Sequence, residues 1–112
     1  MTVEILGMLT GRRDMSVLVV FSWPEVNREQ YERVRTQVDW VNMRPNGANL
    51  HISAFDEAGG LQVVDHWDSA EQFHAFIDAQ IAPAAQAAGI TGQPQVQIYP
   101  IAYVDEFDKL GT

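Results

Sequence analysis

A strand that turns directly into a helix constrains the fold of this chain more than any other segment. Residues 61–81 read LQVVDHWDSAEQFHAFIDAQI, and the first seven alternate between two sides as in an extended chain. The period changes at Asp68-Ser69, where either side chain can cap a helix, and Glu71 and Gln72 stand where a capping box places its return partner. Apolar residues then recur at helical spacing, at Phe73, Phe76, Ile77 and Ile81. The pattern predicts a sheet strand that feeds a covering helix.

Length and composition predict one folded domain. The chain has 112 residues, of which 46% are hydrophobic, which is too many for a disordered protein. No apolar run approaches the roughly 20 residues that a membrane helix needs. In residues 1–15 the arginines follow the apolar part, the reverse of a signal peptide, so we expect a cytoplasmic protein. The absence of cysteine excludes disulfides, thiolate metal sites and a cysteine nucleophile.

The charge argues against polyanionic partners. Fifteen acidic residues against seven basic ones give a formal net charge of −8, and the basic residues form no stripe. Contacts to phosphate dominate nucleic-acid affinity, so we expect no nucleic-acid partner. Anionic membrane surfaces are disfavoured for the same reason.

Four strands and two helices are expected along the chain. The strands are β-branched or alternating segments at residues 16–23, 49–56, 61–67 and 95–104. The first helix is capped by Asn27 and stops at Pro45-Asn46-Gly47, and the second runs from about Ser69 to Ala88, where Pro83 kinks or restarts it. The order β-α-β-β-α-β predicts an α+β, ferredoxin-like fold with an antiparallel sheet.

Two terminal segments lie outside this pattern. We predict an N-terminal extension over residues 1–15, the ferredoxin-like domain over 16–104 and a C-terminal tail over 105–112. The extension is expected to pack on the edge of its own sheet or on a partner subunit, and the tail on a partner.

The sheet is predicted to be apolar on both faces. Two helices can cover one face only, so the other needs a second cover, and a second copy of the chain is the simplest one. We therefore expect a homodimer in which two sheets pack face to face as a dimeric α/β barrel. The side assigned to this interface carries Leu18, Val20, Ile52, Val63, Trp67 and Tyr99.

At the strand–helix junction the chain resembles a known family. The segment VVDHWDSAEQF, preceded by a β-hairpin and by a first strand that ends at Pro24, is similar to the antibiotic biosynthesis monooxygenase (ABM) type of the dimeric α/β-barrel superfamily. Members typically have a strand ending in Trp, then an acidic residue, a short helix cap and an E-x-F motif. The resemblance covers about residues 16–104 and implies the fold; the superfamily includes quinone-forming monooxygenases, haem-degrading enzymes, isomerases and decarboxylases.

The haem-degrading branch is not supported. Its members use an Asn on the first strand, a Trp on the second helix and a His further along that helix. This chain carries Val19, Phe76 and Ala85 at those places. An Ala cannot ligate iron, so haem degradation is not expected.

Two histidines and a serine are the catalytic candidates. If the hairpin loop is the two residues Ala58-Gly59, His51 pairs with His66, and Ser53 lies on the same side of the sheet. Such a cluster under the helices would bind a carbonyl or quinone oxygen or transfer a proton. The alternative is two hydrogen-bonded structural histidines, and a loop longer or shorter by one residue would put them on opposite faces. If His51 pairs with His66, Asp65 and Trp67 point toward the dimer interface.

Substrate contacts are expected from aromatic side chains. We predict that a flat aromatic ligand is bound by Trp23, Tyr31, Phe55, Phe73 and Phe76, although a small core uses the same residue types. The three histidines have no metal-ligand spacing, and no phosphate-binding loop is present, so no metal and no cofactor are expected.

Two functional classes remain. One is a cofactor-independent enzyme, such as a monooxygenase, acting on a small aromatic or polyketide-like substrate in a dry pocket. The other is a non-catalytic dimeric barrel that binds a small molecule or is associated with stress. Convergence of His51 and His66 on a void would favour the first class.

Overall fold

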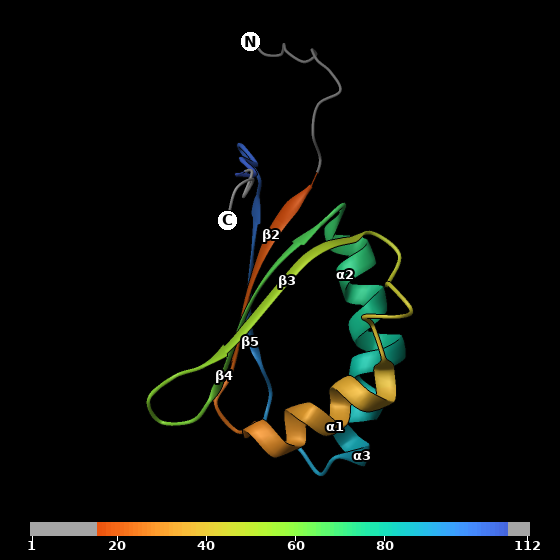
Figure 1. Cartoon of the computed structure of the whole chain (residues 1–112), viewed down its shortest axis with the longest axis vertical. Coiled ribbons are helices and arrows are strands. Elements are labelled where there is room, and N and C mark those ends of the chain that lie inside the picture. The colour runs from red at the N-terminus through yellow and green to blue at the C-terminus, as the bar shows by residue number, and fades with distance from the viewer. Residues whose placement is uncertain (1–15, 108–112) are drawn as a thin grey trace.

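The computed structural model describes residues 16–107. Four strands, one α-helix and a second helical segment that includes a π-helical turn follow one another in the order β-α-β-β-α-β (Figure 1). Their bounds are β2 Val17–Trp23, α1 Arg28–Val38, β3 Ala48–Phe55, β4 Leu61–Trp67, α2 Ala70–Phe76, η1 Ile77–Ile81, α3 Ala82–Ala87 and β5 Gln95–Pro100. The predicted extension over residues 1–15 lies outside the described residues.

The strands form one antiparallel sheet in the order β3-β4-β2-β5. The helices lie together on one side of this sheet, and the other side carries no helix (Figure 1). This is the ferredoxin-like α+β fold that the order of elements predicted. Among residues 16–107, no helix is long and apolar enough to cross a lipid bilayer.

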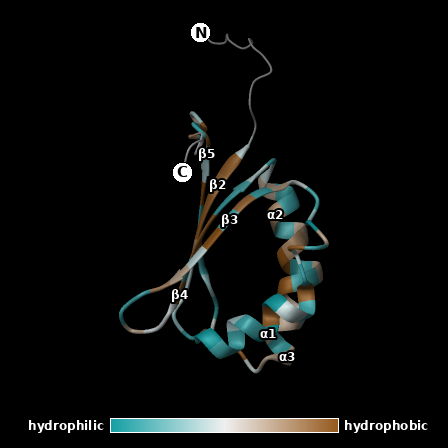
Figure 2. Cartoon of the chain, viewed as in Figure 1, coloured by the Kyte–Doolittle hydropathy of each residue, from teal (hydrophilic) through white to brown (hydrophobic). Residues whose placement is uncertain are grey.

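The core lies between the sheet and the helices. Alternate residues of β2 and β4 point into it, as the strand period requires, and Val19 and Trp67 are almost completely buried. Hydropathy follows the same division, since the helices combine hydrophobic and hydrophilic residues while β2 is largely hydrophobic (Figure 2). The cluster of buried side chains comprises Val17, Val19, Phe21, Trp23, Val26, Tyr31, Leu61, Val63, Trp67, Phe73 and Ala85.

Helix α1 begins as predicted but ends earlier. Asn27 and Gln30 form a complete capping box at its N-terminus. The helix stops at Val38 because Asp39 adopts a left-handed conformation with φ 57°, and its N–H donates to the carbonyl of Arg35. The chain then turns back, and the Trp40 ring lies beside that of Tyr31, with 6.1 Å between the ring centroids.

The hairpin between β3 and β4 corrects the predicted register. Its loop has three residues, 57–59, because the Asp56 N–H donates to the Gly60 carbonyl and the Gly59 N–H donates to the Asp56 carbonyl. Gly59 has φ 91°, which is the left-handed position of a three-residue hairpin. The Asp56 carboxylate also accepts from the N–H groups of Ala58 and Gly60, so it holds the longer loop in place.

This shift of one residue decides which side chains share a face. His51 pairs with Asp65 and His66 pairs with Leu50. The predicted pairing of His51 with His66 is therefore wrong, and the two rings lie on opposite faces of the sheet. Asp65 and Trp67, which were expected at the dimer interface, lie on the helix-covered face with His51 and are buried.

The second helical segment runs without a break through α2, η1 and α3, but its hydrogen-bond pattern changes from α-helical to π-helical and back. Ser69 caps α2 by accepting from the Gln72 N–H, as its place at the junction predicted. A π-helical turn, η1, separates α2 from α3. Pro83 lies in the first turn of α3, directly after the π-helical turn, which is a position where an α-helix tolerates proline.

The helix-free face of the sheet is partly apolar. Leu50, Ile52, Val64 and Tyr99 are exposed there, at 53%, 54%, 38% and 47%. Of the residues predicted for the dimer interface, Ile52 and Tyr99 lie on this face, as do Leu18 and Val20, which alternate with buried residues of β2. Val63 and Trp67 lie on the opposite face because of the corrected register, so their assignment to the interface is wrong.

Candidate active site

An apolar cavity lies between the helices and the helix-covered face of the sheet. Its volume is about 90 Å³. Strands β2, β3 and β4 contribute one wall, and α1, Trp40 and the α2–α3 segment contribute the others. Aliphatic and aromatic side chains share the lining, and the aromatic ones are Phe21, Trp23, Tyr31, Trp40, Trp67, Phe73 and Phe76.

His51 and Asp65 bring polar groups to this apolar surface. The Nδ1 atom of His51 lies 2.7 Å from the Oδ1 atom of Asp65, directly across the β3–β4 pair. The His51 side chain is 29% exposed and that of Asp65 is 8% exposed. A nearly buried carboxylate needs hydrogen-bond donors, and the strand register supplies His51 as one of them.

Two further groups complete a hydrogen-bonded chain. The Tyr31 hydroxyl lies 2.6 Å from the Nε2 atom of His51. At the other end, the indole N–H of Trp67 donates to Oδ2 of Asp65 across 3.0 Å. We call Tyr31, His51 and Asp65, in this order, the relay. Its members come from α1, β3 and β4.

The partners determine the direction of the hydrogen bonds. An ionised carboxylate only accepts, so Asp65 takes one hydrogen from Trp67 and one from Nδ1 of His51. In the neutral imidazole Nε2 is then the acceptor, and the Tyr31 hydroxyl donates to it. The Tyr31 side chain lines the cavity and its oxygen can still accept a hydrogen bond, so the arrangement is able to take up a proton at Tyr31 while the Tyr31 proton moves to Nε2 of His51.

Aromatic rings hold the relay in position. The Trp40 ring packs edge-to-face on His51, with 5.1 Å between centroids, and Phe55 packs in the same way on Tyr31 at 5.9 Å. Such pairs restrict the orientations of the His51 and Tyr31 rings. Trp23 lines the cavity and anchors the sheet to the loop after α3, because its indole N–H donates to the Thr91 carbonyl at 3.0 Å.

The residues predicted from the sequence fall into three places. His51, Tyr31, Trp23, Phe73 and Phe76 line the cavity. Ser53 and Phe55 lie outside it, in a second groove between α1 and β3, which also contains Tyr31. His66 lies on the opposite face of the sheet.

Sequence reasoning assigned Asp65 to the wrong face and so missed it as a site residue. A signal was present: Asp is favoured at the first position of a type I turn, and Gly59 follows three residues after Asp56. This spacing favours the three-residue loop, which pairs Asp65 with His51. Within residues 16–107, no group of three acidic or histidine side chains is arranged to hold a metal ion.

Comparison with known proteins identifies the fold. No protein-family model matches the sequence, and no curated protein matches it. Among solved structures, SnoaB, a cofactor-independent oxygenase from Streptomyces nogalater, superposes with a TM-score of 0.58 at 13% identity, covering 81% of this chain and 96% of that one.

Two further structures are similar. A protein of unknown function from Nitrosomonas europaea, NE2512, has a TM-score of 0.61 at 16% identity, with 85% of this chain and 98% of that one covered. A protein provisionally assigned as an antibiotic biosynthesis monooxygenase from Caulobacter crescentus has a TM-score of 0.58 at 15% identity, with 80% and 92% covered. The chain therefore has the ABM-like fold that its strand–helix junction predicted.

Proposed function

We propose that this chain is a cofactor-independent oxygenase for a small hydroxylated aromatic substrate. The observation that carries the proposal is the relay, which ends with the Tyr31 oxygen at an apolar, aromatic-lined cavity. SnoaB, which shares the fold, is a cofactor-independent oxygenase, and this supports the proposed class of reaction. Fold alone does not determine function, so the argument depends on the chemistry of the cavity.

The relay acts as the general base. A substrate hydroxyl in the cavity gives its proton to the Tyr31 oxygen while the Tyr31 proton moves to Nε2 of His51. The resulting imidazolium is stabilised by the Asp65 carboxylate, which remains ionised and is held in place by Trp67. The apolar walls keep water away from the phenolate and preserve its reactivity.

Dioxygen is the co-reactant, and the substrate supplies all the electrons. The phenolate ring carbon forms a C–O bond with dioxygen to give a peroxide. Cleavage of the O–O bond leaves one oxygen atom as a ring carbonyl, and the other departs as water with the hydrogen of that ring carbon and the proton held by the relay. A phenol and one dioxygen thus give a quinone and one water, with no external reductant.

The size of the cavity limits the substrate. An enclosed apolar cavity of about 150 Å³ accepts benzene. The cavity here, at about 90 Å³, takes part of one ring, so the rest of the substrate remains at the mouth. A substrate of one or two rings fits this arrangement better than a long fused system.

We also propose that the active form is a homodimer. Exposed apolar side chains of the helix-free face come from three strands, Leu50 and Ile52 from β3, Val64 from β4 and Tyr99 from β5. Leu18 and Val20 of β2 lie between Val64 and Tyr99 on the same face. A second copy that covers this face would remove on the order of 1,500 Å² of surface from water, as stable homodimers do. Tyr103 and Phe107, at 87% and 86% exposure, add apolar surface just after β5.

The oxygenase proposal is tested by oxygen uptake. Wild-type protein and a His51→Gln variant are incubated with 1,5-dihydroxynaphthalene in an oxygen electrode, in the presence of a metal chelator. Loss of a general base lowers rates about 10²–10⁴-fold, so the variant is expected to lose nearly all turnover. The matched control is His74→Gln, because His74 is exposed on α2 and does not line the cavity.

Equal turnover by wild type and His51→Gln, with both folded by circular dichroism, would contradict the proposal. The small cavity also favours a second candidate, a non-catalytic protein that binds a small aromatic molecule. That candidate predicts a ligand-dependent rise of the wild-type melting temperature with no oxygen uptake.

A further inference from the structure

We propose that the groove between α1 and β3 binds a carboxylate of the substrate, so that the substrate is a hydroxylated aromatic acid. This inference rests on the proposed function, because it assigns the substrate class of the same site. The groove is lined by Arg28, Tyr31, Glu32, Arg35 and Ser53, with Phe55 at its wall.

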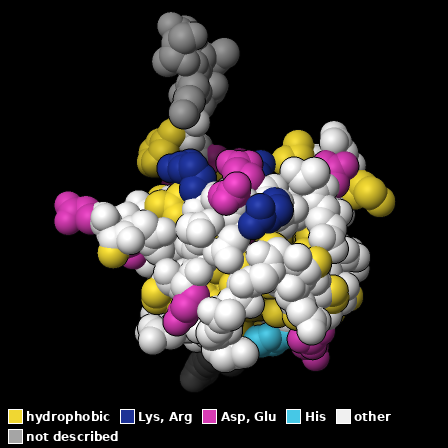
Figure 3. Space-filling view, turned by 90° about the horizontal axis from the view of Figure 1, so that it is seen from below, with side chains coloured by type: hydrophobic (Ala, Val, Ile, Leu, Met, Phe, Trp, Pro, Cys, Tyr) yellow, Lys and Arg dark blue, Asp and Glu magenta, His cyan; other side chains and the backbone are white. Residues whose placement is uncertain are grey.

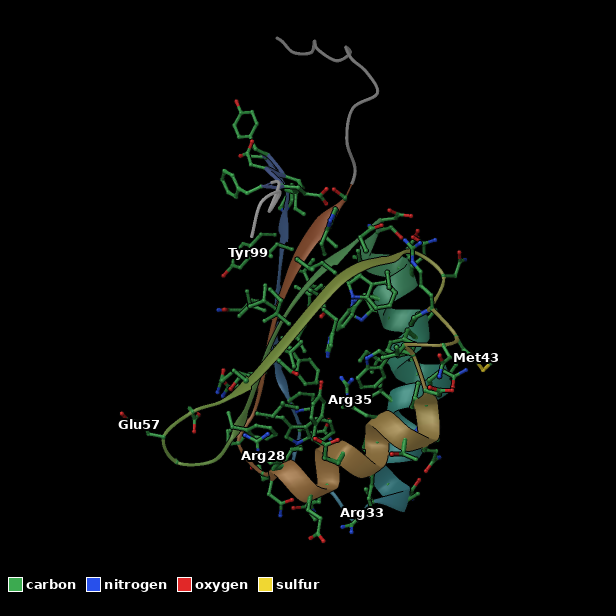
Figure 4. The ribbon with its side chains drawn as sticks, in the orientation of Figure 1. Arg28, Arg33, Arg35, Met43, Glu57 and Tyr99 are labelled. Atoms are coloured by element: carbon green, nitrogen blue, oxygen red, sulfur yellow. The ribbon has the colours of Figure 1, made fainter. Side chains whose placement is uncertain are left out.

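The two arginines face the groove together. Arg28 and Arg35 are seven residues apart on α1, which is two helical turns, so they lie on the same side of the helix. Figure 4 shows both side chains on the side of α1 that faces the strands, whereas Arg33 lies on the outer side. Arg33 has an acidic partner there, Glu29, at 3.8 Å.

The guanidinium groups keep their hydrogen-bond donors available. Arg28 stacks over the Phe55 ring at 4.8 Å from its centroid, and Arg35 stacks over Trp40 at 5.2 Å and Tyr31 at 5.8 Å. Stacking uses the flat face of the guanidinium and leaves the N–H groups at its edge free to bind a planar anion at two points. In the described part of the chain, neither arginine has an ion pair within 4.0 Å.

The charge of the groove contrasts with that of the protein. Two arginines and Glu32 give the groove a formal charge of +1, on a chain whose net charge is −8. Basic and acidic side chains also lie side by side on the face seen from below, with apolar side chains visible between them (Figure 3). A local excess of positive charge attracts an anionic ligand. A guanidinium can donate two parallel hydrogen bonds to the two oxygens of a carboxylate, which favours this kind of anion.

Tyr31 connects this groove to the cavity. Its side chain lines both, and its hydroxyl is the first member of the relay. Arg35 lies over the Trp40 ring, which is itself a wall of the cavity. A carboxylate bound by Arg35 would therefore hold the attached ring at the cavity mouth, with its hydroxyl beside Tyr31.

The test compares ligands that differ in one group. Binding of 3-hydroxy-2-naphthoate and its neutral carboxamide is measured by titration calorimetry without turnover, under nitrogen. Wild-type protein is expected to bind the acid at least tenfold more tightly than the amide, because hydrogen bonds to a charged group are about twice as strong as neutral ones. The variant Arg28→Gln/Arg35→Gln is expected to bind both with equal affinity, whereas Arg33→Gln should keep the wild-type preference.

The outcomes separate this inference from the oxygenase proposal. If wild-type protein has no preference for the acid, or if Arg33→Gln abolishes the preference as fully as the double variant, the carboxylate site is overturned. Oxygen uptake with dihydroxynaphthalene would then still stand. If the acid is preferred through Arg28 and Arg35 but no hydroxylated substrate consumes oxygen, the site is supported and the oxygenase proposal fails.

Discussion

Replacing Asp65 by Asn tests the relay with the smallest change in shape. In the wild type both carboxylate oxygens accept hydrogen bonds, one from His51 Nδ1 and one from Trp67 Nε1. The Asn oxygen can still accept from Trp67. Its amide NH₂ group then faces His51 and can only donate, so the imidazole must carry its proton on Nε2, where the Tyr31 hydroxyl can no longer donate to it. The hydrogen bond between these two residues would then have His51 Nε2 as the donor and the Tyr31 oxygen as the acceptor, the reverse of the wild-type direction.

The magnitude follows from the hydrogen bonds that change. Hydrogen bonds to a charged group contribute about 1.5–3 kcal/mol and neutral ones about 0.5–1.5 kcal/mol. Asp65→Asn is therefore expected to lower the free energy of unfolding by about 1–2 kcal/mol, and each kcal/mol lowers the melting temperature of a domain of this size by about 4 °C. If the charge of Asp65 acts mainly on the imidazolium, losing about 1.5–3 kcal/mol in the transition state lowers kcat roughly 10- to 150-fold.

Nitrogen-15 NMR of histidine-labelled protein reads the proton position directly. The wild-type His51 ring is expected to be protonated on Nδ1 in its neutral form, and the Asp65→Asn ring on Nε2. The His51 signals are assigned by their loss in His51→Gln. A variant that keeps the wild-type tautomer, or that keeps full kcat while the tautomer changes, would refute the reasoning.

Three further predictions concern the interface, the hairpin and a turn. Ile52→Glu places a charge on the proposed dimer face. Light scattering should therefore report a dimer for wild type and a monomer for the variant. A wild-type monomer at micromolar concentration would contradict the proposed dimer. Hydrogen bonds from the Gly60 N–H and the Gln62 side chain lower the pKa of Asp56 below 3.8. The ionised Asp56 carboxylate therefore stabilises the fold above about pH 4, and this stabilisation is lost as the pH falls through the lowered pKa. In Asp56→Asn the free energy of unfolding should fall less steeply between neutral and acid pH than in wild type. The same pH dependence in both proteins would contradict a stabilising role of the carboxylate. Gly47 and Gly59 both have positive φ, but only at Gly47 would a new Cβ clash with the Gln72 side chain. Gly47→Ala should therefore lower the free energy of unfolding measured in urea more than Gly59→Ala does. Equal losses would contradict this.

The sequence predicted the order of elements because their signals are local. The switch from strand to helix period at Asp68-Ser69 and the cap at Asn27 each lie within a few residues, and both are found in the structure. The early end of α1 was not predicted, because the apolar spacing continues to Val41 while the left-handed Asp39 ends the helix.

The site was predicted only in part because it depends on register. His51, Tyr31 and the aromatic walls were named from residue type alone. Their partner Asp65 was not, since a loop longer by one residue reverses the face of every side chain in the strand. The groove with Arg28 and Arg35 depends on how α1 lies against β3, which no local pattern encodes.

Direct reaction of the substrate with dioxygen can be followed through the origin of the oxygen atom in the product. Wild-type protein, freed of metals and flavins, is incubated with 1,5-dihydroxynaphthalene under ¹⁸O-labelled dioxygen, and the product is analysed by mass spectrometry. We expect a quinone with one labelled oxygen at the new carbonyl and one labelled water, formed by wild type but not by Tyr31→Phe, which cannot pass on a proton. A quinone whose new oxygen is unlabelled, or equal labelled product from Tyr31→Phe, would contradict it.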